Sequence, residues 1–571
     1  MANRIPPFIP TLMFIHLFSS TGRAILPPRT AIFKTTVAKM HPYAIGFENA
    51  PEQRVPVDLT IKGEIPSWLS GVLYRTGPGT YRIPSFKDHS RVVDIQHWFD
   101  GLSMNHRFEI HPGGQRVSYR SRKASEDYER QISEHGKIPG IAFGQQPDIC
   151  QSIFRKFFTV FQQMRSPPTS SGSPSGANVQ VTLTPDMPGW GAITERLPEL
   201  KQHQHSGPQY LVAKTDADGL QLVDPISLEP LAVATYKTLD PRLDGQLSAA
   251  HSCRDKEANE FYNYTCKLGG RFPTYKVFRI KGDNKVDVLA EIKDAPASYL
   301  HSFAMTSKYV ILAVWQAHIT GYGMSILYNQ NIAQSIDKKW NPKMNSLFYI
   351  IDKASGGVVA KYETPPFFCF HQLNAFDDPV TDDIILDMSV YEDHSVIDSL
   401  YLNRLRNLTA ENPMLMGRAR RFRLSNVTSP SSTTRIATVE FTLPQSESIE
   451  LPTINPAKYH RPYRYAYGIN KLDPRAHHTF ADRIIKLDME NIDNGHKVWG
   501  IPGYTPSEPI FVPRPGAKDE DDGVVLSVVL DGDRRKSLLI VLDAKDMKEC
   551  ARAEMETAFP IGFHGLWSQS K

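Results

Sequence analysis

The chain has 571 residues, of which 41% are hydrophobic and 22% are charged, and its formal net charge at pH 7 is only +4. Its 65 basic and 61 acidic residues form no basic stripe with interleaved aromatic residues, which argues against nucleic acid as a partner. The five cysteines are scattered without a Cys-x-x-Cys pair, so the composition predicts buried thiols in a reducing compartment rather than a disulfide framework.

The N-terminal segment differs from the rest of the chain. Residues 1–47 contain no Asp or Glu but carry three arginines and two lysines, which resembles an organelle transit peptide. The short apolar run 11–18 resembles the core of a signal peptide instead, and a disordered extension ahead of Met40 is the third interpretation. We predict an extension over 1–47 and one large domain over 48–571. No apolar run approaches the roughly 18 residues that a membrane-spanning helix needs.

An aromatic helix is predicted over residues 149–164. Four of its phenylalanines follow the i, i+3, i+4, i+7 spacing of one helix face, and two cations lie beside that face. The face could pack on a β scaffold, or it could lie on a membrane surface. The Pro/Ser/Gly-rich tract 166–177 that follows is predicted to be a flexible surface insertion.

Most other elements are predicted to be short strands joined by tight turns. Strands over 210–215 and 220–223 flank Asp218-Gly219, and similar pairs occur over 347–362 and 524–542. Four strands end on an aspartate, at Asp224, Asp352, Asp488 and Asp543. These features predict a large antiparallel β protein, although no strict repeat is visible.

Four histidines lie at or beside the ends of short apolar segments: His251, His301, His371 and His564. No two of them are close enough in sequence to form a local metal clip, so only a large closed β fold could bring them together. Imidazole is a suitable ligand for iron, copper and zinc. The glycines on either side of the last histidine suggest that its backbone position is constrained.

Several segments from about residue 61 onward resemble the carotenoid cleavage oxygenase family. They are YRTGPGTYRIP at 74–84, HWFDGLSMNHRFEI at 97–110, the four histidine segments, IELPTINP at 449–456 and SEPIFVPRPGAKDEDDGVVLSVVL at 507–530. They occur in the order found in the family. The resemblance implies an all-β fold, a seven-bladed β-propeller with iron on its axis and a dome of helices and loops over the active site.

The resemblance also implies roles for individual residues. His251, His301, His371 and His564 would bind Fe(2+), while carboxylates would accept hydrogen bonds from their outer ring nitrogens. The matching carboxylates are Glu450, Glu508 and, where the family has glutamate, the shorter Asp216; Asp377 is a weaker candidate. Phe303, Phe370 and Trp567 are candidates for lining a substrate tunnel. His97 belongs to a structural segment and is not expected to be a ligand.

The implied reaction is oxidative cleavage of a carbon–carbon double bond in a carotenoid or apocarotenoid, with dioxygen as co-substrate and apocarotenals as products. Torulene or another long carotenoid is the favoured substrate. We expect a cytoplasmic protein that associates peripherally with a membrane surface, with residues 1–47 as a candidate organelle-targeting segment.

Other functions stay open at this point. Symmetric cleavage of β-carotene to retinal and retinoid isomerohydrolysis would use the same four histidines. Stilbenoid cleavage is disfavoured, because the phenol-activating tyrosine and lysine of that branch correspond to Lys123 and Thr215, although Lys214 lies one residue away. A non-catalytic propeller that binds a partner or an apolar ligand is the alternative outside enzymology.

Overall fold

The computed structural model describes residues 41–88, 90–146, 172–197, 207–269, 272–431, 433–476 and 478–569. All of them belong to one compact unit, Met40–Lys571. The aromatic helix predicted over 149–164, residues 1–40 and the first part of the 166–177 tract lie outside the described residues.

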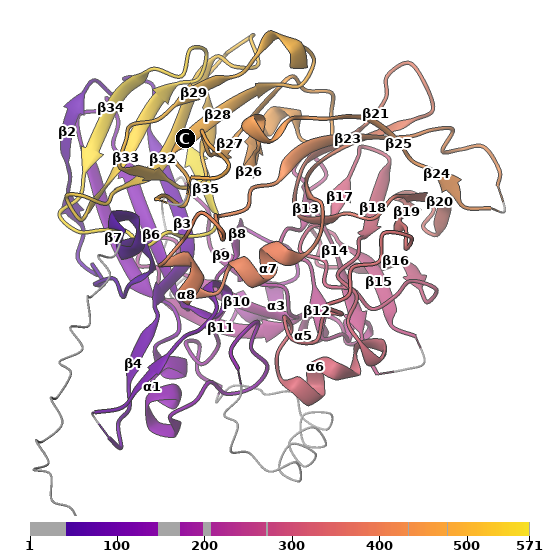
Figure 1. Ribbon diagram of the computed structural model, residues 1–571, viewed down its shortest axis with the longest axis horizontal. Helices are drawn as coiled ribbons and strands as arrows, with labels where there is room; N and C mark the ends of the chain where they lie inside the picture. The colour runs from indigo at the N-terminus through magenta and orange to yellow at the C-terminus, as the bar shows by residue number, and fades with distance from the viewer. Residues whose placement is uncertain are drawn as a thin grey trace, which may run out of the picture. The chain divides into compact units, whose positions relative to one another are not determined.

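Seven sheets of four to six strands make up most of the unit, and their strands pair antiparallel except for β20 and β24, which are parallel (Figure 1). From the outer strand inward, the first sheet is β1 (Val57–Asp58), β7 (Val117–Lys123), β6 (Leu102–Ile110), β3 (Gly71–Thr80) and β35 (Gly565–Gln569). The second sheet is β11 (Pro230–Thr235), β10 (Gly219–Val223), β9 (Leu211–Lys214) and β8 (Thr182–Pro185). The third is β16 (Val286–Ile292), β15 (Thr274–Ile280) and β14 (Glu260–Lys267), and β14 pairs with both β12 (Leu247–Ser248) and β13 (Cys253–Asp255).

The next two sheets are β24 (Arg435–Ile436), β20 (Val358–Thr364), β19 (Ser346–Asp352), β18 (Tyr309–Val314), β17 (Ala304–Met305); and β25 (Thr438–Thr442), β23 (Arg418–Leu424), β22 (Ile384–Tyr391), β21 (Phe368–Asp377). The last two are β29 (Lys497–Trp499), β28 (Arg483–Asp488), β27 (Tyr465–Asn470), β26 (Glu450–Ile454); and β2 (Thr60–Gly63), β34 (Glu549–Glu554), β33 (Lys536–Asp543), β32 (Gly523–Asp531), which pairs with both β30 (Tyr504–Pro506) and β31 (Ile510–Pro513). A separate hairpin joins β4 (Arg82–Pro84) to β5 (Val92–Asp94).

The inner strands form a ring. β17, β21, β26, β31, β35 and β8 contact one another in that order, and His251 bridges to Ser302 between the third and fourth sheets. The C-terminal strand β35 pairs with β3 from near the start of the unit, so the two ends of the chain close the ring inside one sheet. The predicted all-β, seven-bladed propeller is confirmed.

The four predicted strand-end aspartates share one local structure. In each case Oδ1 accepts hydrogen bonds from the backbone N–H groups two and three residues further on, as Asp352 does from Ala354 at 2.8 Å and Ser355 at 2.6 Å. Asp224, Asp488 and Asp543 do the same in other blades. Aspartate is suited to this position because its short carboxylate reaches the turn that follows the strand.

The helices in the described part of the chain are short. They are η1 (Pro42–Phe47), η2 (Trp98–Asp100), α1 (Glu126–His135), α3 (Gly191–Thr194), α5 (Tyr236–Leu239), η3 (Pro241–Leu243), η4 (Gly321–Gly323), α6 (Met324–Asn329), α7 (Ser395–Ser399), α8 (Leu402–Leu405), η5 (Gln445–Glu447), η6 (Pro456–Lys458) and η7 (Ile492–Asn494). Helix η1 falls within the predicted extension over 1–47, yet its Tyr43 and Phe47 are buried. Within the described ranges no helix is long and apolar enough to cross a membrane.

Candidate metal centre

Four imidazole rings meet where the inner strands converge. One ring nitrogen from each of His251, His301, His371 and His564 lies within 4.8 Å of the corresponding atoms of the others. His371 belongs to β21, His301 and His564 lie just before β17 and β35, and His251 lies between β12 and β13. The structure therefore brings together, from four different blades, the four histidines predicted from sequence.

A carboxylate holds the outer nitrogen of His301. Its Nδ1 lies 3.0 Å from Oδ2 of Asp216 and 2.8 Å from Oδ1, and the Tyr299 hydroxyl donates to the same Oδ2 at 2.8 Å. Asp216 follows the end of β9, and that backbone position brings its short side chain into direct contact with the ring. The shorter aspartate therefore reaches the ring directly.

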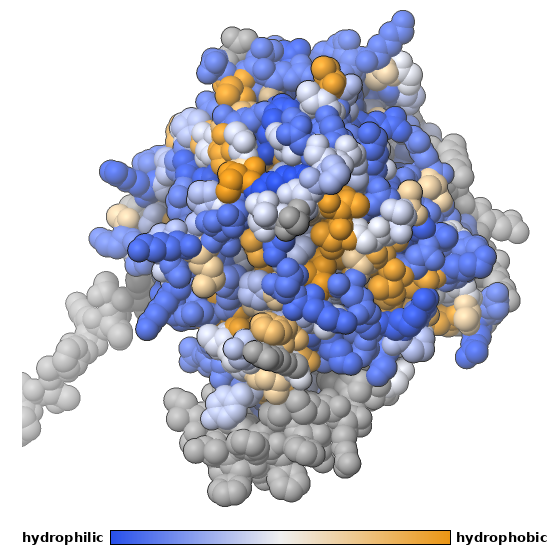
Figure 2. All heavy atoms as spheres, turned by 90° about the vertical axis from the view of Figure 1, so that its right-hand side faces the viewer, coloured by the Kyte–Doolittle hydropathy of each residue, from blue (hydrophilic) through white to orange (hydrophobic). Residues whose placement is uncertain are grey.

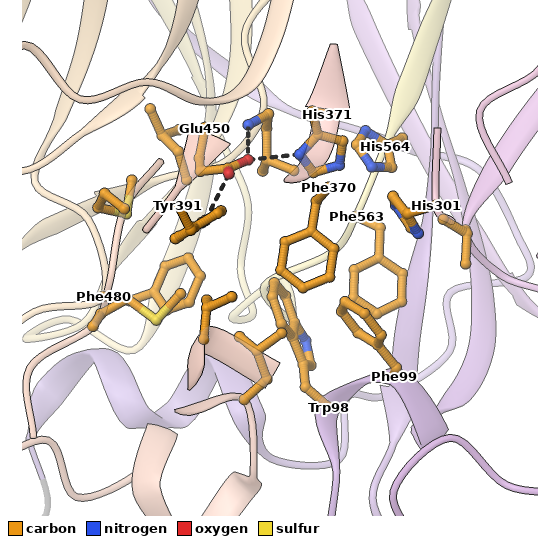
Figure 3. Close-up of a pocket in the computed structure, with 17 residues that line it drawn as sticks. Trp98, Phe99, His301, Phe370, His371, Tyr391, Glu450, Phe480, Phe563 and His564 are labelled. Atoms are coloured by element: carbon orange, nitrogen blue, oxygen red, sulfur yellow. Dashed lines mark hydrogen bonds and ion pairs between the residues drawn. The ribbon is translucent and has the colours of Figure 1, made fainter. Parts of the chain in front are cut away.

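Glu450 binds the outer ring nitrogen of His371 in the same way. Nδ1 of His371 lies 2.6 Å from Oε2, which also accepts a hydrogen bond from the backbone N–H of Leu451, while the Tyr391 hydroxyl donates to Oε1 at 2.6 Å (Figure 3). Burial alone would raise the pKa of Glu450, but the adjoining His371 and these hydrogen bonds outweigh burial and lower it. The carboxylate thus stays ionised opposite the ring.

Glu508 supports His564 and is itself held by a buried cation. Nδ1 of His564 lies 2.7 Å from Oε1, while Oε2 accepts from Nη1 of Arg75 at 2.8 Å and from the backbone N–H of Gly565 at 2.7 Å. Burial raises the pKa of Glu508 to about 7, and Arg75 and the Gly565 N–H oppose that rise. Arg75 lies in the segment 74–84, but its partner is 433 residues away, so no local sequence signal identified it.

His251 has a different environment. Its Nε2 lies 3.0 Å from Nε2 of His564, and its backbone N–H donates to the carbonyl of His301 at 3.2 Å. None of the described carboxylates forms an ion pair with it. Burial and the neighbouring imidazoles hold the pKa of both His251 and His564 well below the usual value. Neutral imidazoles are the form that binds metal.

The geometry fits a transition-metal ion. Three of the rings bind carboxylates through Nδ1, which directs their Nε2 atoms inward. Nε2 of His371 is buried and has no hydrogen-bond partner. A buried polar atom without a partner is costly unless something binds it, and four imidazoles form a donor set for iron, copper or zinc.

A family model described as retinal pigment epithelial membrane protein matches residues 46–569. The chain belongs to that family. It is the carotenoid cleavage oxygenase family that the sequence segments resemble, so the predicted membership is confirmed.

Curated relatives in this family match the chain over most of its length. A carotenoid dioxygenase of Neurospora crassa is 34% identical, covering 92% of this chain and 90% of the relative. A torulene dioxygenase of Gibberella fujikuroi is 33% identical, covering 92% and 94%. The fold is that of an apocarotenoid oxygenase from Synechocystis, with a TM-score of 0.71 at 22% identity, covering 93% of this chain and 98% of that one.

An apolar cavity of about 50 Å³ adjoins three of the four histidines, His301, His371 and His564. Trp98 of η2, Val396 of α7 and Leu400 after it line the cavity. Phe370 and Phe563 lie between Trp98 and the rings of His371 and His564 (Figure 3). The His301 ring stacks on Phe99, with ring centroids 6.1 Å apart. Within the described part of the chain, Glu450 is the one carboxylate in this wall.

Of the three aromatic residues predicted to line a tunnel, only Phe370 lines this apolar cavity. Phe303 is packed in the core against Tyr264, at 6.2 Å between ring centroids, and Trp567 lines a different cavity. Strand periodicity does not reveal on which side of the histidines an inner-strand residue will lie. Trp98 and Phe99 of η2 and Phe563 before β35 also line this cavity, and no local sequence signal identified them.

A second cavity of about 360 Å³, the polar cavity, has a wall of mixed polar and apolar residues and adjoins the centre along the inner strands. Strands β8, β21, β26, β31 and β35 contribute to its wall, as do His251, His371 and His564. Lys214 also lines it, donating from Nζ to Oγ of Ser252, and burial lowers the pKa of this lysine to about 7. The two cavities share the walls formed by His371 and His564.

Three other residues named from the sequence, His97, Asp377 and Lys123, lie elsewhere. His97 is buried, its Nε2 lies 3.1 Å from the carbonyl of Ile397, and burial lowers its pKa to about 4. Asp377 accepts hydrogen bonds from Thr306 and Ser307 and touches none of the four rings in the described structure. Lys123 pairs with Glu129 at 2.9 Å, outside both cavities.

Proposed function

We propose that the protein cleaves a carbon–carbon double bond of a carotenoid oxidatively, using Fe(2+) held by His251, His301, His371 and His564. The observation that carries this proposal is the cluster of four imidazoles, three of them fixed by carboxylates, at the end of an apolar cavity. Ferrous iron bound there would supply the activation of dioxygen.

The residues of this chain would contribute positioning and exclusion of water. Asp216, Glu450 and Glu508 fix the tautomer and direction of three rings, so that the ligand atoms converge without further rearrangement. The aromatic wall offers only apolar contact to a polyene and leaves water few hydrogen-bond partners. Met414 and Met416 are the most adaptable side chains of this wall, because the unbranched methionine side chain can fit irregular shapes.

Torulene, or another long carotenoid, is the proposed substrate, and apocarotenals are the proposed products. Two relatives that are 33% identical over most of their length are named torulene dioxygenase. Symmetric cleavage of β-carotene to retinal is the second candidate, because a relative from Mus musculus that is 28% identical is named beta,beta-carotene 15,15'-dioxygenase. Cleavage of a purified torulene and a purified β-carotene, followed by identification of the aldehydes, would distinguish these substrates.

Two other chemistries have less support. Stilbenoid cleavage needs a tyrosine and a lysine that activate a phenol, yet Lys123 is paired with Glu129 and Lys214 lines the polar cavity rather than the apolar one. Retinoid isomerohydrolysis would consume no dioxygen. Stoichiometric uptake of dioxygen with substrate by the iron-loaded protein therefore supports cleavage, and product formation without uptake contradicts it.

A binding propeller without catalysis would not need a fixed set of metal-competent rings. We propose measuring bound iron and product formation on the same preparation of the wild-type protein and of the variant His371→Ala. If the variant keeps both stoichiometric iron and full turnover, the proposed centre is wrong. If the wild type binds iron but converts none of the carotenoids tested, the binding function is favoured.

Peripheral association with a membrane is a further part of the proposal. A carotenoid is almost insoluble in water, so its entry should begin at a lipid surface. Exposed aromatic side chains lie near η4 and α6, namely Phe272, Tyr322 and Tyr328. The face seen in Figure 2 carries several apolar groups between hydrophilic side chains. The predicted helix over 149–164 is a second candidate contact.

The location in the cell is proposed to be cytoplasmic, with residues 1–47 as a candidate organelle-targeting segment. Relatives that are 27–29% identical are named mitochondrial carotenoid-cleaving dioxygenases. Imaging a fluorescent fusion of the full chain beside one that begins at Met40 would test the targeting role. Identical distributions of the two fusions would remove it.

A further inference from the structure

The polar cavity has a wall rich in unpaired hydrogen-bond donors. Nζ of Lys214, whose residue is 3% exposed, donates to a single hydroxyl, that of Ser252. Nε of Arg254 and Nε1 of Trp567 are buried and have no hydrogen-bond partner among the described residues. All three residues line the same cavity. Buried donors are costly when they are left unsatisfied, so this wall is suited to a ligand that supplies acceptors.

The charged residues of the wall also favour a ligand that supplies acceptors. Lys214, Arg254 and Lys256 are its lysine and arginine residues, and in the described structure Lys214 and Arg254 form no ion pair with a carboxylate. Arg254 instead uses its two terminal nitrogens on the carbonyl groups of Pro185 and Asp186 and on the side chain of Asn259. These contacts orient the guanidinium, and the nearby carboxylate of Asp186 offsets part of its charge.

The one carboxylate in the described wall is already neutralised. Glu508 binds Arg75 at 2.8 Å and His564 at 2.7 Å, so its charge serves the metal centre rather than the lysine and arginine residues of the cavity. His460 also lines the cavity, and burial lowers its pKa, which leaves it neutral near pH 7. Burial lowers the pKa of Lys214 to about 7, so this lysine is partly charged near pH 7, and a bound anion would favour its charged form. Together with Arg254 and Lys256, it gives the cavity more positive than negative charge next to the histidines.

Water molecules would accept hydrogen bonds from the donors of the wall, but they would not offset its positive charge. A volume of about 360 Å³ has room for roughly a dozen water molecules, or for a small ion with part of its hydration shell. An apolar ligand would leave the donors unsatisfied, and a cation would be repelled. An oxyanion offers several acceptor oxygens and negative charge together, which ammonium and guanidinium groups bind more strongly than they bind neutral acceptors.

We propose that the polar cavity is a binding site for a small oxyanion of the carboxylate, sulfate or phosphate type, held by Lys214 and Arg254 beside the metal centre. This site lies outside the apolar cavity and is independent of the proposed substrate. Because the cavity wall includes His251, His371 and His564, an anion there would lie next to the bound metal ion. By reciprocal coupling, each should then strengthen binding of the other.

The test is calorimetric titration of the metal-loaded full-length protein with sodium sulfate, with ionic strength held constant by sodium chloride. The wild type should show saturable binding at one site. Lys214→Met should weaken sulfate binding about 10- to 100-fold, because it removes a charged donor while keeping most of the side-chain volume. Trp567→Phe should weaken it less, because it removes one neutral donor. Lys339→Met, at an exposed lysine outside both cavities, is the control and should bind as the wild type does.

The outcomes separate the possible sites. No saturable binding to the wild type would overturn the proposal. Unchanged affinity in Lys214→Met would place the anion elsewhere, including on the metal ion, and would also overturn it. If Lys214→Met fails to fold, Trp567→Phe decides: unchanged affinity there counts against the site, and weaker binding with an unchanged melting temperature supports it.

Discussion

The ion pair between Arg75 and Glu508 offers a sharp test of how the metal centre is supported. Arg75 is 1% exposed and donates to Oε2 of Glu508 at 2.8 Å, to the Glu508 carbonyl at 3.2 Å and to the Phe563 carbonyl at 3.3 Å. The change Arg75→Met keeps an apolar stem of similar length and removes all three hydrogen bonds. It leaves the buried carboxylate without its cation.

The expected cost follows from the remaining contacts. Breaking a buried pair by removing one partner costs about 3–5 kcal/mol. Glu508 would still accept from His564 and Gly565, so we expect the lower value, about 3 kcal/mol. The folded unit has roughly 530 residues, for which the unfolding entropy is about 1.1 kcal/mol/K, so Tm should fall by about 3 °C. A less firmly held His564 should also weaken metal binding about 10- to 100-fold.

A double-mutant cycle checks the reasoning. In Glu508→Gln alone, the side-chain NH2 group would face Arg75 or the Gly565 N–H. Both of these are donors, so one hydrogen bond is lost and the variant should also be destabilised. Because each single change leaves a partner unsatisfied, the two effects should differ from additivity by about 0.5–3 kcal/mol. Calorimetric melting and metal content by mass spectrometry supply the readouts, with Arg107→Met, at the more exposed pair with Glu109, as control. Additive effects, or wild-type metal content in both single variants, would refute the proposed support.

Three further predictions concern other parts of the molecule. His371→Ala should remove most of the bound metal, because three remaining imidazoles lose both affinity and geometry; full metal content by mass spectrometry would exclude His371 as a ligand. Asp216→Glu should cost about 1–3 kcal/mol, since an extra methylene must fit where the carboxylate already contacts His301; a rise in Tm would show that the position tolerates the longer side chain. Changing three phenylalanines of the predicted helix over 149–164 (Phe157, Phe158 and Phe161) to serine should reduce liposome co-sedimentation and leave activity on detergent-dispersed substrate intact; loss of folded protein would instead indicate core packing.

The sequence allowed much of the fold to be predicted where the signal was local. A turn that follows a strand is determined by a few adjacent residues, so the strand-end aspartates marked real hairpins such as that between β19 and β20. The four histidines were found because each lies in a distinctive segment, and three carboxylates were found by the same matching.

Contacts between distant segments could not be predicted in this way. Arg75 meets Glu508 only because β3 and the loop between β30 and β31 belong to neighbouring blades, and no local pattern encodes that contact. The side of the ring centre on which an inner-strand residue lies depends on strand register and blade tilt. Sequence alone therefore could not show that Phe370 lines the apolar cavity whereas Trp567 lines the polar one and Phe303 packs against Tyr264.

The pairing of β35 with β3 has a consequence for the order in which the protein matures during synthesis. β35 leaves the ribosome nearly 500 residues after β3, the strand with which it must pair. A nascent chain can thus assemble six blades while the first sheet still lacks its inner strand and the centre lacks one imidazole. Metal should be captured with full affinity only after His564 has emerged, and ring closure and metal loading should therefore occur as one event.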